Sequence, residues 1–168
     1  DVLAVVYVMC NEGFVSSTGA TQDRYLAADA VWLAGVIATS FGCPYAGEVS
    51  VDRVLGLAER LAAAGCDEIG FGDTTGMATP TRVTNLVEET RAAHPGLELG
   101  LHFHNTRGTG LANVLAALQL GVDDFDASVG GLGGCPYAPG ASGNIATEEL
   151  VHMLEDMGVD TGVDLTAL

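Results

Sequence analysis

Residues 98–108 read ELGLHFHNTRG, an apolar run that ends on two histidines and continues into polar residues and a glycine. The apolar run is typical of a buried strand, and Asn-Thr-Arg-Gly indicates the end of that strand and the entry to a helix. Successive side chains of a strand point to opposite faces, so His102 and His104 point the same way and Phe103 points the other way. The segment therefore predicts a buried strand whose C-terminal end presents two imidazoles on one face.

Strand and helix patterns alternate on both sides of this segment. The expected strands are Leu3–Met9, Leu33–Thr39, Glu68–Phe71, Leu97–His104 and Phe125–Val129. The expected helices are Tyr25–Trp32, Ser50–Ala64, Thr79–Ala93, Gly110–Leu120 and Thr147–Met157. Regular alternation of this kind predicts an α/β fold with a parallel sheet and helical crossovers.

Two α/β architectures fit the alternation, a (β/α)8 TIM barrel and a doubly wound sheet. No G-x-G-x-x-G follows the first strand, which weakens a dinucleotide-binding interpretation. Polar, glycine-rich loops follow the later strands, and in a TIM barrel such loops form the reaction face. A closed eight-stranded barrel typically needs about 250 residues. We therefore expect either an open sheet or an incomplete barrel of about five βα units that lacks its N-terminal portion.

The composition indicates one globular, acidic domain. Acidic residues outnumber basic ones by 22 to 6 in 168 residues, every basic residue is an arginine, and the net charge is −16. This charge argues against nucleic acid and anionic membranes as partners. No apolar run is long enough to span a membrane, and no basic region precedes the apolar start of the chain, so we expect no signal peptide.

The four cysteines, Cys10, Cys43, Cys66 and Cys135, are widely spaced and form no C-x-x-C motif. Neither a zinc ribbon nor a redox motif is therefore predicted, and we expect free thiols in a reducing cytoplasm. Cys135 differs because it lies in the glycine-rich stretch VGGLGGCPYAPGASGN at 129–144. Such a stretch predicts a mobile loop with an accessible thiol, or alternatively a flexible linker with an incidental cysteine.

Several polar residues fall at the same ends of successive expected strands. His102 and His104 could bind a metal through neutral ring nitrogens, or could be satisfied by hydrogen bonds at a sheet edge. Asn144 could cap the last helix or offer its amide oxygen to a hard cation, and Asp73 follows a strand in a glycine-rich turn where aspartate is common. Their shared position, together with Cys135, favours a metal-dependent enzyme.

The chain from Leu33 to Leu168 resembles the 3-hydroxy-3-methylglutaryl-CoA lyase family. The resemblance rests on HFHNTRG at 102–108 and GGLGGCPYAPGASGN at 130–144, and it extends to FGCPYAGEVS, GDTTGMATP and GNIATEELVHML. The family comprises metal-dependent TIM-barrel lyases with an N-terminal Asp-Arg-Glu motif. The resemblance implies that residues 1–168 are the C-terminal part of a single TIM-barrel catalytic domain, with residues 130–144 as its glycine-rich cysteine loop.

The resemblance also implies the reaction, which is cleavage of 3-hydroxy-3-methylglutaryl-CoA, or a similar 3-hydroxyacyl-CoA, to acetyl-CoA and acetoacetate by retro-Claisen chemistry. Such a reaction belongs to leucine degradation and ketone-body formation. The implied site consists of His102, His104 and Asn144 as ligands of Mg²⁺ or Mn²⁺, Cys135, Asp73 and His102 as catalytic residues, and Gly133 and Gly134 as substrate-binding residues. We also expect a homo-oligomer, in the first instance a dimer.

One part of the family pattern has no counterpart here, because the Asp-Arg-Glu segment is not found and the region before Leu33 matches poorly. We therefore expect the chain to be an incomplete part of a longer enzyme. The alternatives are a related aldolase or Claisen-type synthase with the same H-x-H metal site, and a non-catalytic subunit that lacks the Asp-Arg-Glu half.

Overall fold

The computed structural model describes residues 4–10, 13–16, 32–134 and 143–168, with side chains described from Leu33 onward. Its strands form one sheet in the order β2-β1-β3-β4-β5-β6. The strands are β1 (Ala4–Cys10), β2 (Gly13–Ser16), β3 (Trp32–Ile37), β4 (Glu68–Asp73), β5 (Glu98–Phe103) and β6 (Asp124–Asp126). The helices are α2 (Val51–Ala63), α3 (Pro80–Ala93), α4 (Gly110–Gln119) and α5 (Thr147–Asp156), with a 3-10 turn η1 at Val129–Gly131.

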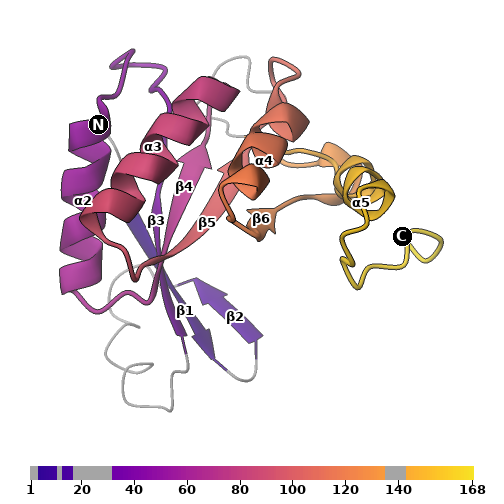
Figure 1. Ribbon diagram of the computed structural model, residues 1–168, viewed down its shortest axis with the longest axis horizontal. Coiled ribbons are helices and arrows are strands. Elements are labelled where there is room, and N and C mark those ends of the chain that lie inside the picture. The colour runs from indigo at the N-terminus through magenta and orange to yellow at the C-terminus, as the bar shows by residue number, and fades with distance from the viewer. Residues whose placement is uncertain (1–3, 11–12, 17–31, 135–142) are drawn as a thin grey trace.

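Strands β3 to β6 are parallel and alternate with helices, which confirms the predicted α/β fold. Helices α2, α3 and α4 lie side by side over one face of these strands, and α5 lies at the β6 end (Figure 1). The side chains beneath the helices form a register row that crosses the sheet. Ile37, Phe71 and Leu101 of this row belong to the buried hydrophobic core, and Phe125 is partly buried and packs against it.

The other face of the sheet has a different composition, because the neighbouring rows carry glycines and polar residues. One row consists of Val36, Gly70, Gly100 and Asp124, and the next consists of Gly72, His102 and Asp126. Paired residues of neighbouring strands project to the same face, so the apolar and polar rows alternate between the two faces. The polar row that ends at Asp126 therefore lies on the face that α2, α3 and α4 do not cover.

Local signals fix the helix boundaries closely. The Ser50 side chain accepts a hydrogen bond from the backbone N–H of Arg53 at 3.4 Å, and α2 buries Val54, Ala58 and Leu61. Thr79 caps α3 in the same way, and Pro80 occupies the first turn, where no backbone N–H is needed. Both helices begin where their capping residues predict.

The first part of the sheet departs from the all-parallel expectation. β1 pairs antiparallel with both β2 and β3. Only two residues separate β1 from β2, and so short a connection joins antiparallel strands, whereas a parallel pair needs a crossover of a dozen or more residues. The prediction of a helix over Tyr25–Trp32 is wrong at its last residue, because Trp32 begins β3. The other residues of the predicted helix lie outside the described part of the chain.

Three arginines fasten loops and helix ends through backbone carbonyl groups. Arg91 of α3 donates to the carbonyl oxygens of Leu120 and Gly121, just after α4. Arg107 donates to the carbonyl oxygens of Thr75 and Gly76, at 2.7 and 3.0 Å. Arg82 makes a third contact of this kind and is described with the site below. Among the described residues, no helix has both the length and the apolar character that crossing a membrane requires.

Candidate metal and active site

The carboxyl ends of β4, β5 and β6 meet at one edge of the sheet, where the polar residues singled out in the sequence lie. Asp73 ends β4, His102 lies near the end of β5 with His104 just beyond it, and Asp126 ends β6. In the parallel register, His102 stands between Gly72 of β4 and Asp126 of β6.

The two imidazoles face the same side of the strand, as the alternation predicted. Their ring centroids are 5.2 Å apart. His104 is buried, with 5 % of its surface exposed, whereas about a third of the His102 side chain is exposed. Burial lowers the pKa of His104, and the charge of His102 lowers it further. Neutral imidazole is the form that binds metal, so the environment of His104 suits a ligand.

Asn144 lies directly opposite His104 although the two are 40 positions apart in the sequence. They form an antiparallel bridge that is flanked by two hydrogen bonds, from Asn105 N–H to the Gly143 carbonyl (3.0 Å) and from Ile145 N–H to the Phe103 carbonyl (3.2 Å). This pattern is that of a non-hydrogen-bonded pair, in which opposite side chains approach most closely. The structure therefore brings the amide of Asn144 beside the imidazole of His104.

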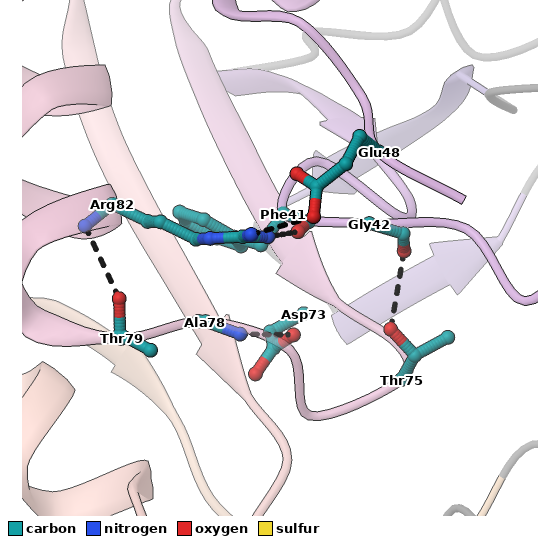
Figure 2. Close-up of polar contacts among 8 residues, drawn as sticks. All are labelled: Phe41, Gly42, Glu48, Asp73, Thr75, Ala78, Thr79 and Arg82. Carbon is teal, nitrogen blue, oxygen red and sulfur yellow. Dashed lines mark hydrogen bonds and ion pairs between the residues drawn. The ribbon is translucent and has the colours of Figure 1, made fainter.

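Asp73 is almost fully buried and shapes the loop between β4 and α3. Its Oδ1 accepts hydrogen bonds from the backbone N–H groups of Met77 (2.7 Å) and Ala78 (3.0 Å), and Figure 2 shows the second of these. Burial raises the pKa of Asp73 to about 6, against the opposing effects of the two N–H groups, Arg107 and His102. Because Asp73 pairs with Phe103, its side chain leaves the strand on the helix-covered face, opposite to the imidazoles.

The loop between β3 and α2 is held to the β4–α3 segment by hydrogen bonds. Arg82 of α3 donates to the Phe41 carbonyl and to Glu48 Oε1, both at 2.7 Å (Figure 2). The Thr75 hydroxyl donates to the Gly42 carbonyl at 3.1 Å (Figure 2). The sequence interpretation missed Arg82, because an arginine in the first turn of a helix is an ordinary surface residue until its distant partners are known.

The β3–α2 loop also holds Cys43, which is buried and not in a disulfide. Hydrogen bonds from the backbone N–H groups of Ala46 and Tyr45 lower the pKa of its thiol. Cys66 is buried and free as well, and burial raises the pKa of its thiol. Cys135, the predicted catalytic thiol, lies outside the described residues.

The glycine-rich segment approaches Asn144 where it is described. Gly133 has φ +96°, and a Cβ added to it would lie 3.0 Å from Asn144 Nδ2. That nitrogen donates to the Leu132 carbonyl at 2.8 Å, so the amide is oriented with its oxygen free. Gly134 is exposed. A side chain at Gly133 would therefore be strained by the positive φ and would require the Asn144 amide to shift by a few tenths of an ångström.

Five buried side-chain atoms have no hydrogen-bond partner in the described structure, and three of them are His104 Nδ1, Asn144 Oδ1 and Asp73 Oδ2; the others are Thr39 Oγ1 and Asn113 Oδ1. Buried polar atoms are normally satisfied, so such atoms in a native site call for a ligand, ion or water. No group of three or more His, Cys, Asp or Glu side chains in the described ranges is placed to hold a metal. Among the residues that the sequence singled out as ligands, His102 and His104 offer imidazole nitrogens and Asn144 offers an amide oxygen, donors of the kind that divalent cations accept.

Comparisons with known proteins found a matching family model and several similar chains. The HMGL-like family model matches residues 16–168. The hydroxymethylglutaryl-CoA lyase YngG of Bacillus subtilis is 51 % identical over 132 residues, which cover 79 % of this chain and 44 % of the relative. The (R)-citramalyl-CoA lyase of Chloroflexus aurantiacus is 52 % identical over 132 residues, which cover 79 % of this chain and 42 % of the relative.

A solved structure shares the fold as well as the sequence. The HMG-CoA lyase of Acinetobacter baumannii, in complex with coenzyme A and 3-methylmalate, superposes with a TM-score of 0.75 at 52 % identity, over 80 % of this chain and 44 % of that protein. The chain thus spans less than half the length of the relatives that it matches.

Proposed function

The chain belongs to the HMGL-like family, and on that premise we propose that it is the C-terminal part of the catalytic domain of a carbon–carbon lyase. In this proposal, residues 1–168 form part of a single TIM barrel, and residues 130–144 form its glycine-rich cysteine loop. The observation that carries the proposal is the meeting of His102, His104 and Asn144 at the carboxyl edge of a parallel sheet, which is where TIM-barrel enzymes hold their active sites.

The proposed reaction is retro-Claisen cleavage of 3-hydroxy-3-methylglutaryl-CoA to acetoacetate and acetyl-CoA. The C3 hydroxyl loses its proton and becomes a ketone as the C2–C3 bond breaks, and the electron pair of that bond stays on C2, which then takes up a proton. The names of the relatives and the coenzyme A in the Acinetobacter complex support an acyl-CoA substrate.

We propose that the site holds Mg²⁺ or Mn²⁺ through His102, His104 and Asn144. When bound, such a cation would polarise the substrate hydroxyl and lower its pKa. The chain itself prepares the donors, because burial keeps the His104 imidazole neutral and the hydrogen bond to Leu132 orients the Asn144 amide with its oxygen free. Both effects reduce the rearrangement that ligand binding requires.

The proton steps are assigned to the remaining predicted residues. Asp73 is proposed as a catalytic residue on the resemblance to the family, although its side chain leaves β4 on the face opposite to the imidazoles. Its pKa of about 6 lets the unpaired Oδ2 take up or release a proton close to neutral pH. Cys135 is proposed as the thiol that protonates C2 of the departing acetyl group. Gly133 and Gly134 are proposed to let the backbone approach the substrate closely, which side chains at these positions would prevent.

The cellular location of the protein and its binding partners belong to the same proposal. Two free cysteines in the described region and the acidic charge are compatible with a cytoplasmic enzyme that binds neither nucleic acid nor membrane. We propose a homo-oligomer, most simply a dimer, and sedimentation velocity on the purified protein tests this directly.

The function is tested by supplying Mn²⁺ or Mg²⁺ and measuring cleavage of 3-hydroxy-3-methylglutaryl-CoA, citramalyl-CoA and a panel of 2-oxoacids. Acetoacetate production from the first substrate supports the proposal. The 52 % identity to a citramalyl-CoA lyase makes that substrate the second candidate. Condensation of a 2-oxoacid would indicate a related aldolase or synthase. Normal cation binding without turnover of any substrate would indicate a non-catalytic subunit.

A further inference from the structure

Asp126 ends β6, the strand next to β5, and its carboxylate lies 3.2 Å from a ring nitrogen of His102. We propose that Asp126 is a positioning residue that fixes the His102 imidazole in the tautomer with its proton on Nδ1, which leaves Nε2 available to a cation. The metal part of this inference rests on the proposed function, whereas the tautomer part concerns the protein without metal.

The strand register and a close contact both place the side chains of His102 and Asp126 together. His102 and Asp126 are register partners in the parallel pairing of β5 and β6, so their side chains project to the same face. The Nδ1 atom of His102 then lies 3.2 Å from Asp126 Oδ2, within hydrogen-bond distance. Asp126 is the last residue of β6, so this contact lies at the carboxyl edge, where His104 and Asn144 also meet.

The chemistry of the pair determines which nitrogen carries the proton. An ionised carboxylate can only accept hydrogen bonds, so the contact with Asp126 requires an N–H at His102 Nδ1. In neutral imidazole the other nitrogen, Nε2, then carries the lone pair. Histidines that bind metals commonly donate their second N–H to a carboxylate, which fixes the ring orientation and raises the basicity of the ligand.

Other carboxylates on this face are engaged elsewhere. Asp124 pairs with Gly100, and its side chain hydrogen bonds with that of Glu68 across the space that Gly100 leaves open. Asp73 leaves its strand on the opposite face and accepts two backbone N–H groups. Asp126 is therefore the described acidic residue whose carboxylate contacts a proposed ligand.

The test compares Asp126→Ala with Asp126→Glu, which keeps a carboxylate at an exposed position that has room for one more methylene group. Asp123→Ala removes the same charge from the residue just before β6 and serves as the matched control. Nitrogen-15 NMR of the metal-free protein reports the tautomer of His102, and a His102→Gln variant assigns its signals. Manganese titration followed by electron paramagnetic resonance reports the affinity for Mn²⁺.

We expect the wild-type protein and Asp123→Ala to show the Nδ1–H tautomer, Asp126→Ala to show a mixture, and Asp126→Glu to restore the wild-type signals in part. The affinity for Mn²⁺ should fall about 10- to 100-fold in Asp126→Ala and less in Asp126→Glu. An unchanged tautomer in Asp126→Ala overturns the inference. If the tautomer changes as expected but the wild-type protein binds no Mn²⁺, the proposed metal site fails and the positioning of His102 by Asp126 stands.

Discussion

The buried carboxyl group of Asp73 opposes folding when it is ionised, so its replacement by asparagine should stabilise the protein at neutral pH. Its pKa rises from 3.8 to about 6 in the folded protein, chiefly because burial removes the carboxylate from water and leaves only 1 % of the residue's surface exposed. Since one pKa unit corresponds to 1.36 kcal/mol, ionised Asp73 costs about 3 kcal/mol relative to the unfolded chain. An asparagine oxygen can still accept the N–H groups of Met77 and Ala78, so we expect Asp73→Asn to gain about 1–3 kcal/mol.

The stability gained by Asp73→Asn should increase as the pH rises. Between pH 3.8 and about 6 the folded state binds more protons at Asp73 than the unfolded state, so the wild-type free energy of unfolding falls as the pH rises. Asp73→Asn lacks this loss. The difference between the two proteins should therefore be small near pH 3.5, grow through this interval and stay constant above it.

Urea unfolding of the metal-free protein at several pH values measures this difference, with Asp123→Asn as a control at an exposed position. The variant should also be less active, because a proton at Oδ2 and the free oxygen itself are lost. A stability difference that does not change with pH, or a variant that is destabilised equally at every pH, would refute the explanation by burial of charge.

Three further changes test the packing and the proposed chemistry. Gly110→Ala should destabilise the protein by about 1–3 kcal/mol in urea unfolding, because the added Cβ would overlap Ile145 next to Asn144, whereas Gly56→Ala meets no atom within 4 Å and should be neutral or slightly stabilising. Cys135→Ser should lower turnover by about 10²- to 10⁴-fold with little change in Mn²⁺ affinity, and an equal loss of Mn²⁺ would contradict its role as a proton donor. His102→Ala should remove both Mn²⁺ binding and activity, and unchanged Mn²⁺ content by atomic absorption would rule it out as a ligand.

Local chemistry explains which parts of the fold were predictable. Helices α2 and α3 begin at their capping residues, Ser50 and Thr79, because a cap depends on neighbours in the sequence. The pairing of β1 was not predictable in the same way, since the direction of a strand depends on its partner and on the length of the connection. The strand expected at Phe125–Val129 ends early, at Asp126, and Gly130 in the following turn takes φ +62°.

The same distinction between local and long-range relations explains which parts of the candidate site were predictable. The period of two along β5 placed His102 and His104 on one face, because that relation is contained within three residues. Whether Asn144 lies beside His104 depends on a bridge between distant segments, which no local pattern specifies. Asp126 was missed because it is one acidic residue among 22, and only the register of β6 separates it from the others.

The arginine contacts with backbone carbonyls have a consequence for substitution. Arg91 and Arg107 each donate to two successive carbonyl oxygens, and Arg82 joins one carbonyl to a carboxylate. Arg91 and Arg82 make their two contacts from different nitrogens, Nη1 and Nη2, whose donors are fixed in a planar fork that an ammonium group lacks. Arg107 makes both of its contacts from Nη1. Exchange of Arg82 or Arg91 for lysine would preserve the net charge and still weaken the contacts between neighbouring βα units, so arginine in place of lysine has a geometric reason at two of the six basic positions of this chain.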